Sequence, residues 1–141
     1  MSNIKLNKIF KTVCIASDHA GFKLKEDIKN YLIDKSISIF DIGPFNEQSV
    51  DYPDYAKKLG NRIKLKKSDV GILVCGSGTG MAISANKIKT IRAAVCYNLK
   101  STRLSRQHNN ANIIALGSRL TKKKLSLRLV EIFLKTKFEG G

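Results

Sequence analysis

Short apolar runs alternate along the chain with segments in which apolar residues recur every three or four positions. The runs are rich in β-branched residues and predict five strands, at 12–17, 37–42, 70–75, 91–96 and 112–116. The segments with helical periodicity predict helices around 24–32, 56–63, 79–89 and 125–133. The run at 70–75 is almost continuously apolar, which is typical of a strand covered on both faces.

Strands that alternate with helices through short connections are typical of a parallel sheet. We therefore predict an α/β fold, a three-layer Rossmann-like sandwich with a five-stranded parallel sheet and helices on both faces. The length of 141 residues fits one domain. We assign residues 1–10 to a polar N-terminal extension and residues 11–141 to the single domain.

Composition narrows the functional classes. Hydrophobic residues make up 43% of the chain, which excludes a disordered protein, and no apolar run approaches the roughly 18 residues of a membrane span. The N-terminus lacks the apolar stretch of a signal peptide. Three cysteines without a CxxC pair argue against a disulfide framework and favour a cytoplasmic location.

The formal net charge is +15, which favours anionic partners. The basic residues are scattered, however, and no basic run is interleaved with aromatic residues for stacking on bases. A solvated basic surface is therefore the better interpretation, and we expect neither a nucleic-acid nor a membrane partner.

In open α/β sheets, ligands bind beyond the carboxyl ends of the strands, so residues that directly follow strands are candidate site residues. Cys75 ends the third strand and opens a loop of small residues, Gly76, Ser77, Gly78, Thr79 and Gly80, ahead of a helix. Backbone N–H groups of such a loop and the helix N-terminus suit an anion or a developing oxyanion, and the same field favours a thiolate. A buried strand cysteine beside a tight turn is the alternative. The loop lacks the residues of a P-loop, a dinucleotide fingerprint or a cysteine phosphatase loop.

Asp18 and His19 follow the first strand. They could orient hydroxyls, bind phosphate or transfer protons, whereas the structural alternative makes Asp18 the N-cap of the next helix. His108 precedes the fifth strand, and Cys14 and Cys96 are expected in the core within strands. No cluster has metal-ligand spacing, so we predict no metal.

Several segments together resemble ribose-5-phosphate isomerase B, in order and from about Val13 to the C-terminus. They are Asp18–Phe22, Asp51–Pro53, Ile72–Gly80, Ala85–Lys87, Ile91–Ala93, Leu104–Asn109, Gly117–Arg119 and Phe138–Gly141. The resemblance implies interconversion of ribose 5-phosphate and ribulose 5-phosphate through an enediolate, in the pentose phosphate pathway, without cofactor or metal. It also implies a homodimer, or a tetramer, with sites at the subunit interface.

The same resemblance implies residue roles. Cys75 is the base that moves the proton between C2 and C1, and Ser77 transfers the hydroxyl proton. His108 assists ring opening, while Asp18 holds the ring oxygen or hydroxyls. The residues implied in substrate binding are His19, Tyr52, Gly76, Gly78, Thr79, Gly80, Asn109 and Arg119. Family members typically continue past Glu-Gly-Gly with Arg residues for the phosphate, whereas this sequence stops at Gly141. Either that tail is missing from the sequence, or Arg119, His19 and the basic field bind the phosphate.

Two alternatives to this function stay open at the level of sequence. One is an isomerase of galactose 6-phosphate or allose 6-phosphate, and the other is a non-catalytic phosphate-binding module in which Cys75 is inert.

The location of His108 before a strand, and of Cys75 after one, predicts that they lie at opposite edges of the sheet, roughly 20 Å apart for a six-residue strand. A two-fold dimer would bring the two residues of different chains together.

Overall fold

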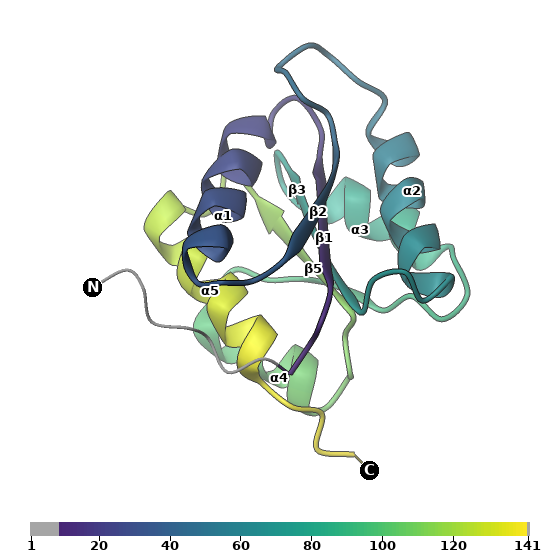
Figure 1. Cartoon of the computed structure of the whole chain (residues 1–141), viewed down its shortest axis with the longest axis vertical. Coiled ribbons are helices and arrows are strands. Elements are labelled where there is room, and N and C mark those ends of the chain that lie inside the picture. The colour runs from purple at the N-terminus through teal and green to yellow at the C-terminus, as the bar shows by residue number, and fades with distance from the viewer. Residues whose placement is uncertain (1–8, 141) are drawn as a thin grey trace.

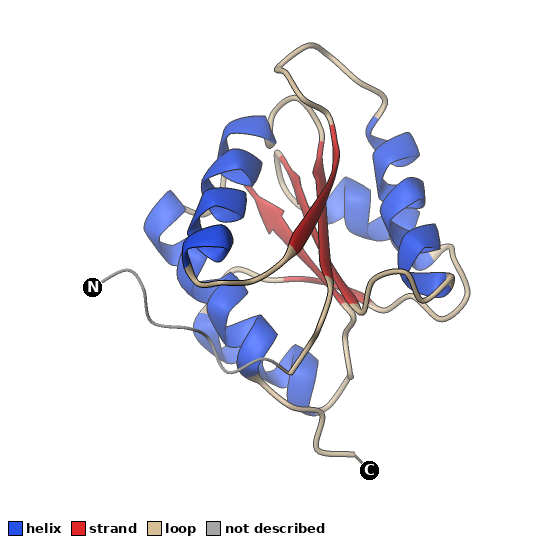
Figure 2. Ribbon diagram, in the orientation of Figure 1, coloured by secondary structure: helices blue, strands red, loops and turns tan. Residues whose placement is uncertain are grey.

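The computed structural model describes residues 9–140, which form a parallel sheet between two layers of helices (Figures 1 and 2). The strands are β1 (Val13–Ser17), β2 (Ile39–Gly43), β3 (Val70–Cys75), β4 (Ala93–Val95) and β5 (Ile113–Gly117). The helices are α1 (Phe22–Asp34), α2 (Tyr52–Lys64), α3 (Thr79–Asn86), α4 (Leu99–Gln107) and α5 (Lys123–Lys135). The predicted three-layer α/β fold is confirmed.

All strand pairs are parallel, in the order β2-β1-β3-β5-β4. The strand order reverses between β1 and β3, where the crossovers run to opposite sides of the sheet. This is the position at which ligands bind in open α/β sheets.

Each face of the sheet has its own core. Helices α1, α4 and α5 cover one face, where Ile28, Leu32 and Phe133 pack against β1, β3 and β5. Helices α2 and α3 cover the other, where Leu59 and Met81 pack against the same strands. The central strands are buried on both faces, in agreement with their continuous apolar sequence.

Strand β1 begins at Val13 rather than at residue 12, and β2 spans Ile39–Gly43 rather than residues 37–42. Strand β4 and helix α3 are also shorter than predicted. Strand β4 begins at Ala93 rather than residue 91, because the N–H groups of Arg92 and Ala93 bond to the side chains of Asn112 and Asn86. Helix α3 ends at Asn86 rather than at residue 89, because the Asn86 amide also donates to the carbonyl of Ala93 and so ties the helix end to the strand. Cys96 therefore follows β4 instead of lying within it, although it is fully buried as expected.

Helix α4 is absent from the sequence prediction. Its buried residues are Thr102, Ser105 and Arg106, so the helix has no apolar stripe for a periodicity argument to detect. Asn98 starts it, and its side chain accepts the N–H of Ser101 at 2.8 Å.

The predicted N-terminal extension, residues 1–10, lies mostly outside the described residues. Phe10 is described and packs against the core beneath the guanidinium of Arg106, which lies 4.9 Å from the ring centre. Within the described part of the chain, no helix is both long and apolar enough to cross a bilayer.

Candidate active site

A pocket of about 390 Å³ opens at the carboxyl edge of the sheet. It is lined by residues that follow β1, β3 and β5 and by the first residue of α2: Asp18, Tyr52, Cys75, Gly76, Ser77, Gly80, Arg119 and Leu120. Seven of these eight are predicted site residues. Leu120 is the exception, and no pattern in the sequence distinguishes it.

Cys75 is the last residue of β3, and its side chain is 5% exposed. Its Sγ accepts the backbone N–H of Gly78 at 3.1 Å. Gly78 has φ +82°, a left-handed conformation that turns the loop back over the sulfur before α3 begins at Thr79. The thiol therefore lies in a loop whose N–H groups and helix N-terminus favour negative charge.

Three glycines leave space for other parts of the site. A Cβ at Gly76 would lie 3.1 Å from Nη1 of Arg119, and one at Gly80 would lie 3.0 Å from the ring of Tyr52. A Cβ at Gly117 would lie 2.8 Å from the backbone of Ser77. The glycines thus allow Arg119 and Tyr52 to lie directly on the Cys75 loop.

Backbone contacts lock the loops after β3 and β5 together. The N–H of Ser118 donates to the carbonyl of Cys75 at 2.8 Å, and the N–H of Arg119 donates to the carbonyl of Gly76 at 3.0 Å. The hydroxyl of Ser118 donates to the carbonyl of Ala20, which connects the loop after β1 as well. Arg119 is therefore fixed at its backbone, while its side chain lies against Gly76 and lines the pocket.

Asp18 lies at the end of β1 and is 8% exposed. Its N–H donates to the carbonyl of Val74, and its Oδ1 accepts the N–H of Gly21 at 2.9 Å. Gly21, not Asp18, is the N-cap of α1, so the structural alternative for Asp18 is wrong in its detail. The carboxylate stabilises the turn before the helix and still lines the pocket.

Other predicted site residues lie outside this pocket. Gly78 and Thr79 belong to the Cys75 loop without lining the cavity, and His19 is exposed beside Asp18. His108 and Asn109 are exposed at the end of α4, before β5 begins at Ile113. Figure 1 places α4 at the end of the molecule opposite the carboxyl edge of the sheet.

The other two cysteines differ from Cys75 in their surroundings. Burial raises the pKa of Cys14 to about 11 and also raises the pKa of Cys96. Both are fully buried, which agrees with the prediction that they are core residues. Among the described residues, no group of three His, Cys, Asp or Glu side chains could hold a metal ion.

Known proteins with similar sequence and structure agree with the resemblance read from the motifs. A family described as "Ribose/Galactose Isomerase" matches residues 13–141. The ribose 5-phosphate isomerase of Thermotoga maritima is 52% identical with a TM-score of 0.91, covering 92% of this chain and 90% of that one. The ribose-5-phosphate isomerase B of Mycoplasma genitalium, solved with bound ribulose-5-phosphate, is 40% identical with a TM-score of 0.87, covering 92% and 87%. Ribose-5-phosphate isomerase B of Escherichia coli is 39% identical over 93% of this chain and 88% of that protein. The chain belongs to the ribose/galactose isomerase family.

Proposed function

We propose that this protein is an aldose–ketose isomerase that interconverts ribose 5-phosphate and ribulose 5-phosphate. The observation that carries the proposal is the Cys75 thiol, which accepts the N–H of Gly78 in a pocket that Arg119 also lines. The Mycoplasma genitalium relative, which binds ribulose-5-phosphate, supports the choice of substrate.

Isomerisation requires one mobile proton and a fixed field for a negative intermediate. Cys75, as the thiolate, removes the proton from C2 of the open-chain aldose and returns it to C1, so the sulfur ends as it began. Ser77 transfers the hydroxyl proton between O1 and O2. The N–H groups from Gly76 to Gly80 stabilise the enediolate, and one such donor contributes roughly 3 kcal/mol to a transition state.

Phosphate recognition falls to Arg119, with Tyr52 and His19 near the same edge. A guanidinium can hold two phosphate oxygens at once, which gives both affinity and orientation. The carboxylate of Asp18 would accept a hydrogen bond from a sugar hydroxyl. These roles assign a task to every polar side chain that lines the cavity.

The proposed enzyme is a homodimer, or a dimer of dimers, with sites shared between subunits. The support is the location of His108 and Asn109, which lie at the amino edge while Cys75 lies at the carboxyl edge. A strand of six residues is roughly 20 Å long, which is too far for His108 to open the ring of a sugar bound at Cys75 of the same chain.

A cytoplasmic location is part of the proposal and is supported by three free thiols.

Substrate choice is tested by comparing turnover of ribose 5-phosphate with that of allose 6-phosphate and galactose 6-phosphate. We expect the five-carbon sugar to have the highest kcat/KM. A preference for either six-carbon sugar would assign the chain to another branch of the family. Turnover of none of them, together with tight phosphate binding, would indicate a non-catalytic module.

Shared sites are tested by mixing two inactive variants, Cys75→Ala and His108→Ala, after dissociation and reassociation. In a mixed dimer one site carries both lesions and the other carries neither, so about a quarter of wild-type activity should return. A mixture of Cys75→Ala with wild type should keep about half of the wild-type activity with or without exchange, so it controls for losses during dissociation and reassociation. Persistent inactivity despite confirmed exchange would mean that one chain supplies both groups.

A further inference from the structure

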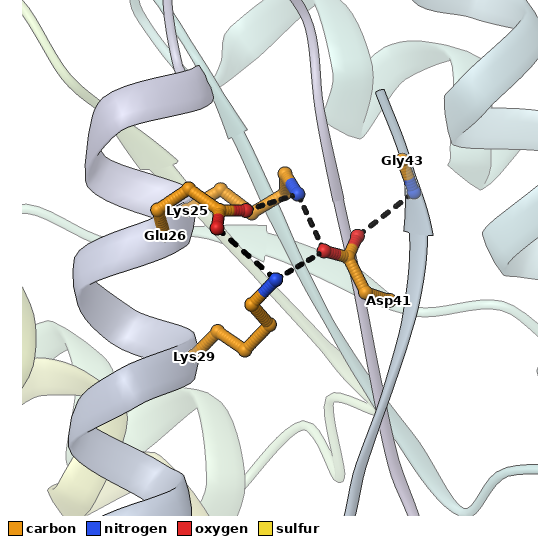
Figure 3. Close-up of polar contacts among 5 residues, drawn as sticks. All are labelled: Lys25, Glu26, Lys29, Asp41 and Gly43. Atoms are coloured by element: carbon orange, nitrogen blue, oxygen red, sulfur yellow. Dashed lines mark hydrogen bonds and ion pairs between the residues drawn. The ribbon is translucent and has the colours of Figure 1, made fainter. Parts of the chain in front are cut away.

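Lys25 is an unusual residue for the interior of a protein. It lies on α1, its side chain is fully buried, and it is among the largest fully buried side chains of the described residues. The ammonium group donates to Oδ2 of Asp41 at 2.7 Å and to Oε2 of Glu26 at 2.8 Å (Figure 3). Lys29 contacts the same two carboxylates, so two lysines face two acids.

Such a network contributes little net stability, because the cost of desolvating the charges offsets much of their attraction. Replacing all members of such a network by apolar side chains of similar volume is often neutral or stabilising. Buried ion pairs are better attested as devices that fix one geometry. Lys25 and Asp41 are therefore expected to fix the position of the segments that they contact.

The network holds the end of β2. Ile15 and Ala16 of β1 pair with Asp41 and Gly43, so Ile42 is an extra residue that breaks the register. Oδ1 of Asp41 accepts the N–H of Gly43 at 2.9 Å and closes this bulge (Figure 3). The carboxylate thus binds α1 with one oxygen and sets the exit of the chain from β2 with the other.

Beyond the bulge the chain enters the β2–α2 loop, residues 44–51, which arches above the carboxyl edge of the sheet (Figure 1). Phe45 is the second residue of this loop, and its ring centre lies 5.6 Å from Nζ of Lys25, while the ring centre of Phe22 on α1 lies at 5.2 Å. The side-chain hydrogen bond described within the loop is local, from Gln48 N–H to Asn46 Oδ1. The contact between Lys25 and Phe45 therefore connects an otherwise weakly held loop to α1.

The loop leads directly to Tyr52, the residue of α2 that lines the pocket. The first turn of α2 has no side-chain cap, since Asp51 makes no capping hydrogen bond. Gly43 packs beneath the same turn, because a Cβ there would lie 3.1 Å from the ring of Tyr55. The position of Tyr52 over Gly80 thus depends on how β2 ends and on how the loop is held.

We propose that Lys25, through Asp41 and Phe45, is a positioning residue that sets the Tyr52 wall of the substrate pocket. The inference rests on the proposed function for its substrate and on the contacts of Lys25 for its mechanism. Lys25 does not touch substrate; it determines where the chain leaves β2 and therefore where Tyr52 lies.

The test compares Lys25→Met with Lys29→Met in the full chain. Both substitutions remove one ammonium from Asp41, but only the first removes the contact with Phe45. We expect Lys25→Met to raise KM for ribose 5-phosphate about fivefold with kcat within about twofold. Backbone amides of residues 43–52 should exchange about tenfold faster. Lys29→Met should change KM and the amide exchange rates less than twofold, which is the size of effect expected of a surface substitution.

A double variant separates positioning from a general loss of stability. If Lys25 acts through Tyr52, then adding Lys25→Met to Tyr52→Ala, which removes the ring, should raise KM no further than Tyr52→Ala alone. Additive effects, a change in kcat with KM constant, or unchanged exchange in residues 43–52 would each overturn the proposal.

If Lys25→Met does not fold, Phe45→Leu takes its place as the test variant. Phe45 is 72% exposed, so its loss does not endanger the core, and it should loosen the same amides and raise KM in the same direction. No change in either quantity would overturn the proposal. Amide exchange needs no turnover, so its result stands even if ribose 5-phosphate proves not to be the substrate.

Discussion

At the carboxyl edge of the sheet the polar groups surround a cavity, whereas at the amino edge they hold backbone segments together. The first edge carries Cys75 and Arg119 beside glycine N–H groups. At the second edge the buried guanidinium of Arg106 donates to the carbonyls of Thr136 and Ala111. His108 lies next to that structural arrangement, exposed and outside the pocket.

The difference between the two edges shows which residues of one chain can act together at one site. Groups that follow strands converge because parallel strands end at a common edge. Groups that precede strands are separated from them by the length of the sheet. Arg106 anchors the end of α4, and the N–H of Glu139 donates to the carbonyl of Gln107, so the C-terminal segment also lies beside His108. His108 is thus exposed beside residue 139 at the amino edge, as the proposed shared site requires.

The largest effect should come from Cys75→Ala at the carboxyl edge. Removing the proton carrier should lower kcat about a thousandfold, while substrate binding persists because Arg119 and the loop N–H groups remain. Steady-state turnover and binding of ribulose 5-phosphate by calorimetry would measure both. Turnover within tenfold of wild type would mean that another group carries the proton.

Cys14→Ala and Cys96→Ala are the matched controls for that variant. Both thiols are fully buried, so each substitution should lower the free energy of unfolding by about 1–2 kcal/mol without changing kcat. Chemical denaturation with parallel assays would separate the two effects.

The next largest effect concerns thiol chemistry. Cys75 lines the pocket, while burial raises the pKa of both Cys14 and Cys96. Iodoacetamide at neutral pH should therefore alkylate Cys75 at least about a hundredfold faster than the other two. Mass spectrometry of tryptic peptides would give the three rates, and sugar phosphate should slow only the first. Equal rates would remove the chemical distinction between the pocket and the core.

Gly80→Ala should have a smaller effect that is confined to binding. The added methyl would lie 3.0 Å from the Tyr52 ring, so the ring must move away from the Cys75 loop. We expect KM to rise about fivefold while kcat changes little, since Cys75 itself is undisturbed. In a Tyr52→Ala background the methyl meets no ring, so Gly80→Ala should then have no further effect on KM. A persistent rise would place the disturbance in the loop itself.

Much of this architecture could be predicted from the sequence, for identifiable reasons. The strands of the centre were predicted because burial on both faces makes them continuously apolar, as at 70–75. Helix α4 was not, because it buries Thr102, Ser105 and Arg106 through hydrogen bonds to backbone groups rather than through apolar packing. Apolar periodicity contains no information about that kind of burial.

The site shows the same division. The glycine pattern around Cys75 predicted the loop, since short polar residues after a buried strand suit an anion site. The pattern did not indicate that Gly76 and Gly80 make room for Arg119 and Tyr52, because those contacts join segments far apart in the sequence. The burial of Lys25 was equally hidden, since a lysine on a helix is ordinarily exposed and Asp41 lies 16 residues away.

The buried cations of the two edges should differ in their response to acid. Lys25 and Lys29 bond to carboxylates, and although burial alone would raise the pKa of Asp41, their hydrogen bonds and charges hold it below its ordinary value. A lowered pKa in the folded state means that this stabilisation is complete above about pH 4 and is lost as the pH falls through the folded pKa.

Asp41→Asn should therefore lower the free energy of unfolding by about 2 kcal/mol at pH 7 and by progressively less below pH 4. The cost of Arg106→Met should stay constant from pH 7 to pH 3, because the acceptors of Arg106 are uncharged carbonyl and amide oxygens. Urea denaturation of both variants across that range measures the two differences, and parallel pH profiles would mean that the charge of Asp41 contributes nothing to stability.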